Sequence, residues 1–168
     1  MNEADIQLEP ATPNQQPILE NLLELYAHDF SEFFEIEIGE DGRFGYPNVG
    51  LYYSEPGRHP FLLRSHGKLA GFAFVRKTPA VTGEETVWDM AEFFVLRAYR
   101  RHGVGSAIAH QLFRRFPGRW EVRVMQSNQA GRAFWQRAIA SFTSQPIQPV
   151  VFDRGEKHWF VFSFNTPA

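Results

Sequence analysis

The chain has 168 residues and a formal net charge of −2, and this length fits one ordinary domain. A hydrophobic content of 43% and an aromatic content of 15% exclude a disordered or low-complexity chain. Because the sequence contains no cysteine, disulfides, thiolate metal sites and thiol nucleophiles are excluded as well. We therefore expect a single domain over residues 1–168.

Charge is distributed unevenly along the chain. The first 42 residues hold eleven of the nineteen acidic residues and none of the seventeen Lys and Arg, so residues 43–168 carry a net charge of +9. The acidic N-terminus lacks the basic patch and apolar run of a secretory signal. No apolar stretch approaches the roughly 20 residues of a membrane span. These features predict a cytoplasmic protein without a membrane partner.

The N-terminal part predicts a short edge strand, a helix and a loop region. Ile6 and Leu8 alternate with polar residues, as in a strand at the edge of a sheet. Residues 12–15 form a capping-box pattern with Pro at the first helical position, and a helical apolar stripe follows over residues 18–26. Residues 29–49 mix Phe with acids and contain several turn signals, which favours a functional loop region with room for one short helix.

The remaining elements alternate between strands and helices. Apolar runs joined by a short polar link with Gly67 predict a hairpin, and a long apolar run containing Asp89 and Glu92 predicts a central strand. The predicted strands cover residues 61–63, 69–75, 87–95, 120–125, 150–152 and 158–164, and the predicted helices cover residues 104–116 and the segment after Asn128. This order predicts an α/β fold in which helices cover both faces of a mixed sheet.

A glycine-containing turn lies between the predicted central strand and the next helix, with the sequence Arg100-Arg101-His102-Gly103-Val104-Gly105-Ser106. Such a turn presents unpaired backbone N–H groups and the positive end of the helix dipole. Six arginines and no acids fall between Arg97 and Arg119. The turn is neither a P-loop nor a dinucleotide fingerprint. It predicts a pyrophosphate cradle, with a solvated basic helix start as the alternative.

Two segments resemble the GNAT superfamily of N-acetyltransferases. The run Glu92–Gly105 is similar to the acyl-CoA motif, a strand followed by Arg/Gln-x-x-Gly-x-Gly/Ala and a helix. The run Asn128–Trp135 is similar to the motif Asn-x-x-Ala-x-x-Phe-Tyr, with Gly131 in place of Ala and Trp in place of Tyr. Residues 116–121 also resemble a subgroup of uncharacterised predicted acetyltransferases. The resemblance extends over about residues 5–164 and implies the mostly antiparallel central sheet of the acyl-CoA N-acyltransferase (GNAT) fold.

The resemblance implies acetyl transfer from acetyl-CoA to a primary amine, on a small molecule or a peptide, by direct attack in a ternary complex. Main-chain groups of Phe94 and Val95 would bind the pantetheine arm and polarise the thioester carbonyl. Asn128 and Phe134 would line the other side of the arm, with plain core packing as the alternative for Phe134. The full set of implied cofactor-binding residues is Phe94, Val95, Arg100, Arg101, His102, Gly103, Val104, Gly105, Ser106, Asn128 and Phe134.

Amine attack on a thioester requires a base that removes the ammonium proton. Glu92 and Asp89 are the candidate catalytic residues, with Glu92 ranked first and at least one of the two expected to be a salt-bridged structural acid. On a regular strand they point to opposite faces, which a bulge would change. The indole of Trp135 cannot act as the general acid of the family. Either the thiolate leaves unaided, Tyr26 or Tyr99 substitutes, or the domain binds CoA without turnover.

The acidic N-terminal region predicts the acceptor side of the site. Tyr26, Asp29 and Glu32 are candidate substrate-binding residues that would attract a cationic amine, with a solvated acidic surface as the alternative. The six histidines show no paired metal-ligand spacing, so no metal is expected. A nucleic-acid binder is disfavoured by the negative net charge and by the lack of a stacking motif. The expected partners are acetyl-CoA and an amine, with no nucleic acid, and a homodimer is left open.

Overall fold

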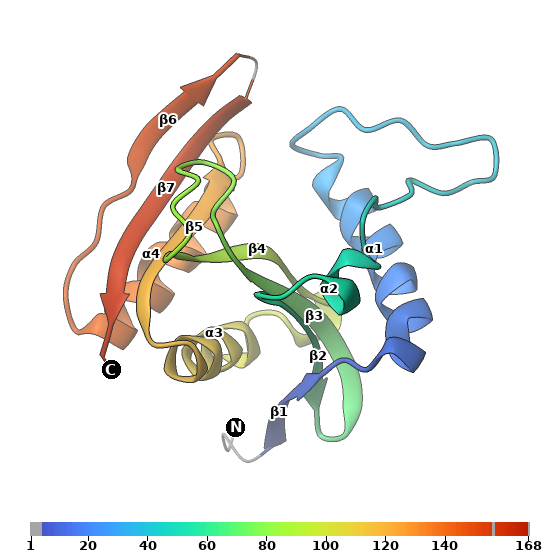
Figure 1. Ribbon diagram of the computed structural model, residues 1–168, viewed down its shortest axis with the longest axis horizontal. Helices are drawn as coiled ribbons and strands as arrows, with labels where there is room; N and C mark the ends of the chain where they lie inside the picture. Colours follow the sequence, from blue (N-terminus) through green and yellow to red (C-terminus); the bar gives the residue numbers. More distant parts are fainter. Residues whose placement is uncertain (1–4, 156, 168) are drawn as a thin grey trace.

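The computed structural model describes residues 5–155 and 157–167. Seven strands form one sheet in the order β1-β2-β3-β4-β5-β7-β6 (Figure 1). Neighbouring strands are antiparallel except for the parallel pair β4 and β5. The strands are β1 (Ile6–Pro10), β2 (Arg58–Ser65), β3 (Lys68–Lys77), β4 (Trp88–Val95), β5 (Gly118–Met125), β6 (Val150–Arg154) and β7 (Lys157–Thr166). The helices are α1 (Gln16–Phe30), α2 (Leu51–Ser54), α3 (Val104–Arg115) and α4 (Gln129–Thr143).

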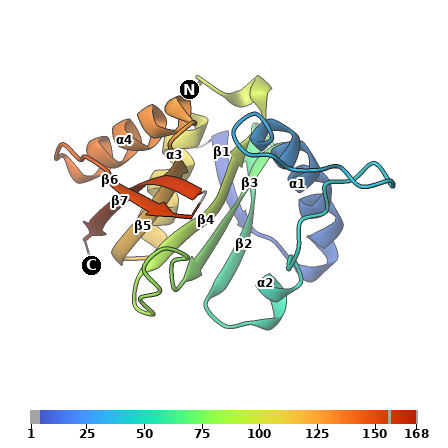
Figure 2. The ribbon, with the colours of Figure 1, turned by 90° about the horizontal axis from the view of Figure 1, so that it is seen from above.

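Helices cover both faces of the sheet, which confirms the predicted fold class (Figure 2). One core lies between the sheet and α1 with α2, and includes Leu19, Leu23 and Phe72. The other lies between the sheet and α3 with α4, and includes Ile108, Trp120 and Phe162. The central strand β3 is buried on both faces, which explains why its sequence is a continuous apolar run rather than an alternating one.

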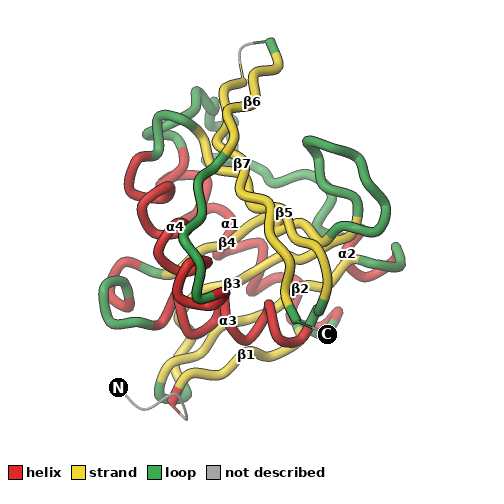
Figure 3. Tube along the Cα trace, turned by 90° about the vertical axis from the view of Figure 1, so that its left-hand side faces the viewer, coloured by secondary structure: helices red, strands yellow, loops and turns green. Residues whose placement is uncertain are grey.

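The structure differs from the sequence predictions mainly at element boundaries. The helix predicted from Pro13 begins with a 3-10 turn, Pro13–Gln15, in which the Gln15 side chain accepts the Thr12 N–H at 2.9 Å. The short helix α2 begins just beyond the predicted loop region. At the C-terminal end, β7 lies between β5 and β6. The hairpin of β6 and β7 extends along one side of the molecule (Figure 3). Within the described residues, no helix is both long and apolar enough to cross a membrane.

The sheet splits between β4 and β5. These strands pair only at Trp88 with Trp120 and at Asp89 with Glu121, near the start of β4. A bulge follows in β4, because Met90 and Glu92 pair with adjacent residues of β3 and Ala91 has no partner there. The extra residue reverses the alternation, so Asp89, Ala91 and Glu92 all lie on the α1 face of the sheet. Asp89 and Glu92 were expected on opposite faces of a regular strand unless a bulge intervened, and this bulge brings them to the same face.

Glu121 is a buried acid at the end of the split where β4 and β5 still pair. Glu121 of β5 is only 1% exposed, and neither of its carboxylate oxygens has a hydrogen-bond partner within the described part of the chain. Burial raises the pKa of the Glu121 carboxyl, the neighbouring charge of Asp89 raises it further, and the nearby Thr82 and Arg119 side chains offset only part of the increase. Folding therefore favours the protonated form of Glu121.

This carboxyl predicts a pH-dependent stability difference. The stabilisation due to a raised pKa is complete below the ordinary value of 4.5 and is lost as the pH rises through the folded-state pKa. We expect Glu121→Gln to gain free energy of unfolding relative to the unaltered protein as the pH rises from about 4 to about 8. Urea unfolding at several pH values measures this difference, with Glu85→Gln, at an exposed residue of the loop before β4, as the control. A difference that stays constant with pH would contradict the prediction.

Candidate active site

The split leaves one edge of β4 without strand partners. The Leu96 N–H donates to the Ala70 carbonyl of β3 at 2.8 Å, and a Cβ at Gly71 would lie 2.0 Å from the Phe94 carbonyl oxygen. Phe94 therefore directs its carbonyl toward β3. Because successive residues alternate, the main-chain groups of Phe93 and Val95 face the split. The sequence predicted that the main-chain groups of Phe94 and Val95 bind the ligand arm. In the structure, the main-chain groups of Phe93 and Val95 face the split instead.

The glycine turn lies where β4 leads into α3. Arg101 has φ +64° and Gly103 has φ +79°, so two residues of this turn adopt the left-handed conformation. The Ala107 N–H donates to Gly103, and none of the backbone N–H groups from Arg101 to Ser106 finds an acceptor among the described residues. The turn is solvent-exposed at Arg101, His102 and Gly103. Its free donors and the helix dipole together make an anion-binding geometry.

The side chain of Arg100 already has partners. Its Nε donates to the Val95 carbonyl at 2.7 Å, and its guanidinium also bonds to Asp29 of α1. Arg97 donates to the same carboxylate at 2.7 Å. Partial burial would raise the pKa of Asp29, but hydrogen bonds from Arg100 and Arg97 lower it overall. Asp29, expected to attract the acceptor, thus joins α1 to the turn after β4.

The start of α4 borders the same turn. Asn128 caps α4, because its Oδ1 accepts the Gly131 N–H at 2.7 Å. A Cβ at residue 131 would lie within 2.9 Å of three side-chain atoms of Asn128, which explains the glycine at this motif position. Phe134 is half-buried and lies against Gly105, where a Cβ would come 3.1 Å from its ring. Phe134 thus packs against the core and also lies beside the turn.

Glu92 lies at the split with both carboxylate oxygens hydrogen-bonded. The Tyr26 hydroxyl donates to Oε2 at 2.6 Å and the Tyr46 hydroxyl donates to Oε1 at 2.9 Å. Burial raises the pKa of Glu92, although Arg123 and the two hydroxyls act in the opposite direction. Burial and the charge of Glu92 raise the pKa values of Tyr26 and Tyr46, so both tyrosines stay protonated.

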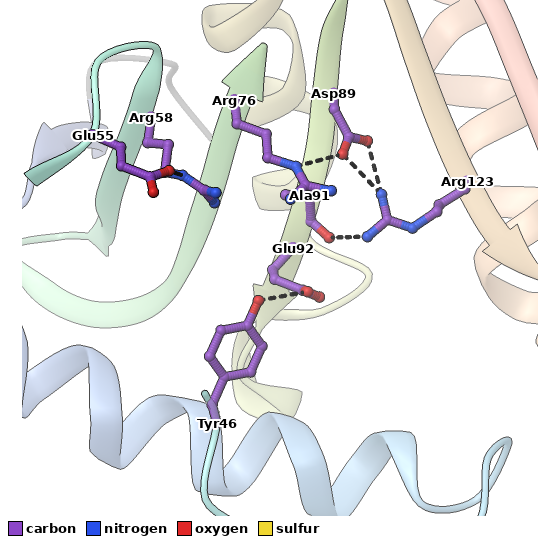
Figure 4. Close-up of polar contacts among 8 residues, drawn as sticks. All are labelled: Tyr46, Glu55, Arg58, Arg76, Asp89, Ala91, Glu92 and Arg123. Carbon is purple, nitrogen blue, oxygen red and sulfur yellow. Dashed lines mark hydrogen bonds and ion pairs between the residues drawn. The ribbon is translucent and has the colours of Figure 1, made fainter. Parts of the chain in front are cut away.

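Asp89 has a different environment, shown together with Glu92 in Figure 4. Its side chain is 1% exposed and accepts from Arg76 Nε at 3.0 Å and from Arg123 Nη1 at 2.9 Å. Arg123 extends from β5 across the split and also donates to the Ala91 carbonyl at 3.2 Å. Asp89 is therefore salt-bridged, as expected for at least one of the two acids. Both of its carboxylate oxygens accept hydrogen bonds from arginines.

The remaining candidates are spread around this centre. Glu32 is exposed beyond the end of α1, and Tyr99 packs against the core on the α3 side. Trp135 is 7% exposed, with its ring 5.0 Å from Phe93 and 4.9 Å from Phe134 between centroids. Sequence analysis did not identify Tyr46 or Arg123. The polar position of Arg123 between apolar residues of its strand is a weak signal for Arg123, and nothing in the loop sequence singles out Tyr46.

The sheet thus splits beside a free strand edge that lies next to an anion-binding helix start. Residues 19–139 match the model of the acetyltransferase (GNAT) family, more than half of the chain, so the chain belongs to this family. No curated protein sequence matches the chain.

Solved structures share the fold at low sequence identity. An acetyltransferase from Thermus thermophilus is 15% identical with a TM-score of 0.70, covering 98% of this chain and 99% of its own. The ribosomal-protein-S18-alanine N-acetyltransferase of Escherichia coli is 13% identical with a TM-score of 0.60, covering 97% and 95%. An aminoglycoside acetyltransferase in complex with coenzyme A is 11% identical with a TM-score of 0.66, covering 95% and 94%. These likenesses establish the fold.

No group of three or more potential metal-ligating side chains occurs among the described residues. The absence of a metal stays a prediction, because this finding covers only the described part of the chain. The polar groups at the split are instead carboxylates, tyrosine hydroxyls and guanidinium groups.

The different environments of the two acids predict different effects of mutation. Asp89→Asn removes the carboxylate that neutralises Arg76 and Arg123, so it should lower the free energy of unfolding by about 3–5 kcal/mol. Urea unfolding measures the loss. The matched control is Glu84→Gln, which breaks the exposed pair with Arg119 and should cost at most about 1 kcal/mol. An Asp89→Asn variant as stable as the control variant would show that the cluster has no structural role.

Proposed function

We propose that the chain transfers an acetyl group from acetyl-CoA to a primary amine. In this reaction the neutral amine nitrogen attacks the thioester carbonyl carbon, the C–S bond breaks, and coenzyme A leaves as a thiolate. Glu92 takes the proton that the ammonium loses before the attack, and water takes the second proton, which the attacking nitrogen gives up as the amide forms. The observation that carries the proposal is the position of Glu92, a half-buried carboxylate with a raised pKa, beside the free edge of β4.

The free edge of β4 and the turn after it would hold acetyl-CoA. The N–H groups from Arg101 to Ser106 would bind the pyrophosphate, assisted by the exposed side chain of Arg101. The main-chain groups of Phe93 and the N–H of Val95 would pair with the pantetheine arm, as a neighbouring strand would, because the Val95 carbonyl already accepts from Arg100. Phe134 and the capping residue Asn128 lie on the α4 side of the same turn. We assign the pyrophosphate mainly to backbone groups, because Arg100 is held by Val95 and Asp29.

A module that binds CoA without turnover is the alternative, supported by the burial of Trp135 at the position of the family's tyrosine acid. The doubly hydrogen-bonded Glu92 favours the enzyme, because a module that only binds has no use for a base at the split. The acceptor amine, a cytoplasmic location and a homodimer stay predictions. The acids beyond α1, including Glu32, remain exposed for a cationic acceptor.

Binding of acetyl-CoA is the first test. Calorimetry should detect acetyl-CoA binding by the unaltered protein, and Arg101→Ala should weaken it roughly three- to tenfold, with a shallower dependence on salt. Arg137→Ala, an exposed arginine on the outer part of α4, is the matched control and should leave affinity unchanged. If the unaltered protein fails to bind acetyl-CoA, the enzyme and the binding-module proposals both fail.

Turnover is the second test. Thiol release from acetyl-CoA should occur with a member of an amine panel that includes polyamines, a peptide beginning with alanine and an aminoglycoside. Glu92→Gln should lower kcat/KM about 10²–10⁴-fold while leaving the Kd for acetyl-CoA unchanged. The defect should shrink toward alkaline pH, where the acceptor amine is already neutral. Binding of acetyl-CoA without thiol release for the whole panel would favour the binding module, and full activity of Glu92→Gln would exclude Glu92 as the base.

A further inference from the structure

The two hydroxyl groups on Glu92 come from very different environments. Tyr26 belongs to α1, and its ring lies within 5.7 Å of the rings of Phe30, Phe72 and Phe94 between centroids. Core packing therefore fixes Tyr26. Tyr46 belongs to the loop between α1 and α2 and packs against the edge of the same core, where its ring has one aromatic neighbour among the described residues, Phe74 at 6.1 Å. With fewer aromatic contacts than Tyr26, the Tyr46 hydroxyl depends for its position also on how the loop itself is held.

Glu24 of α1 holds that loop immediately before Tyr46. Its carboxylate accepts the Phe44 N–H at 2.7 Å and the Gly45 N–H at 3.1 Å, and Arg43 Nε lies 3.4 Å away. Partial burial would raise the pKa of Glu24, but the two backbone N–H donors and Arg43 lower it overall, so the carboxylate is ionised at neutral pH. One charged side chain thus fixes three consecutive loop residues, and the next residue places its hydroxyl on Glu92.

A small cavity adjoins this arrangement. It has a volume of about 160 Å³ and is lined by Glu20, Glu24, Arg43, Gly45, Tyr46 and Val49. The cavity separates part of the loop from α1, so the bonds to Glu24 are the main polar connection between them at this point. Loss of the Glu24 carboxylate would leave space into which the loop, and Tyr46 with it, can shift.

We propose that Tyr46 and Glu24 are positioning residues for Glu92: Glu24 fixes the loop, and the Tyr46 hydroxyl holds one oxygen of the base in its ionised form. This inference rests on the proposed function, because Glu92 is its target. It goes further by making the strength of the base depend on the conformation of an acceptor-side loop. A bound acceptor that shifts the loop would thereby change the proton affinity of Glu92.

The charged and titratable groups around Glu92 determine the expected direction. Tyr26 and Tyr46 donate to its carboxylate, Arg123 of β5 stabilises its negative charge, and Asp89 on the same strand opposes it. Removing a donor from the ionised form raises the pKa of Glu92. Tyr46→Phe should therefore shift the acid limb of the kcat/KM profile to higher pH by roughly one unit. Glu24→Gln should produce a smaller shift in the same direction.

The decisive readout does not require turnover. The pKa of Glu92 can be followed by NMR in protein labelled with ¹³C at the glutamate carboxyl, with Glu92→Gln identifying the signal. Tyr46→Phe and Glu24→Gln should both raise this pKa, and the double variant should match Tyr46→Phe alone, because Glu24 acts through Tyr46. Tyr53→Phe is the matched control: the Tyr53 hydroxyl has no partner among the described residues.

The outcomes separate the two proposals. If the Glu92 pKa rises in both single variants and the double variant shows no further rise, the positioning role stands even where no amine is acetylated. If Tyr46→Phe leaves the pKa unchanged, or if the effects of the two substitutions add, the inference is wrong. Tyr26→Phe should also raise the pKa, but combined with Glu24→Gln it should show additive effects, because Tyr26 is held by the core.

Discussion

The buried contact between Asp89 and Arg123 is the constraint on which the site depends. It lies where β4 and β5 stop pairing, and it replaces strand hydrogen bonds with side-chain bonds across the split. Two buried charges are costly to desolvate unless all their bonding groups find partners. Here Arg76 supplies a second cation to Asp89, and the carbonyl freed by the bulge at Ala91 accepts from Arg123. The strands can therefore separate without leaving this carbonyl or these charges unpaired.

The same cluster sets the electrostatics of Glu92. Arg76 and Arg123 bring two positive charges and Asp89 one negative charge, so an ionised Glu92 completes a neutral group. Arg123 therefore favours the ionised carboxylate, whereas burial favours the protonated one and prevails in raising the pKa. A carboxylate with a raised pKa has more proton affinity than a free glutamate, which suits the proposed role of taking a proton from an ammonium group.

The elements were predictable from the sequence because their signals are local. Apolar periodicity located the strands and helices, and the glycine turn was recognisable from its place between β4 and α3. The bulge at Ala91 was not, because one extra residue in a strand leaves no trace in composition yet reverses which residues share a face. The contact of Tyr46 with Glu92 also escaped prediction, because it joins a loop to a strand 46 positions away. The Asp29 contacts escaped prediction for the same reason, since they join the end of α1 to arginines at least 68 positions away.

In the proposed reaction, the positions of the tyrosine hydroxyls determine whether a side chain can protonate the leaving thiolate. On the α4 side of the split, Trp135 packs against Phe93 and Phe134 and offers no acid. The hydroxyls of Tyr26 and Tyr46 lie on the α1 side, and both already donate to Glu92. Neither is free to protonate sulfur without giving up that bond. A thiol with a pKa of about 8.5 leaves readily as a thiolate, which needs no acid at neutral pH. We infer that the proton chemistry of this site is concentrated on the amine, through Glu92 and the two tyrosines that hold it.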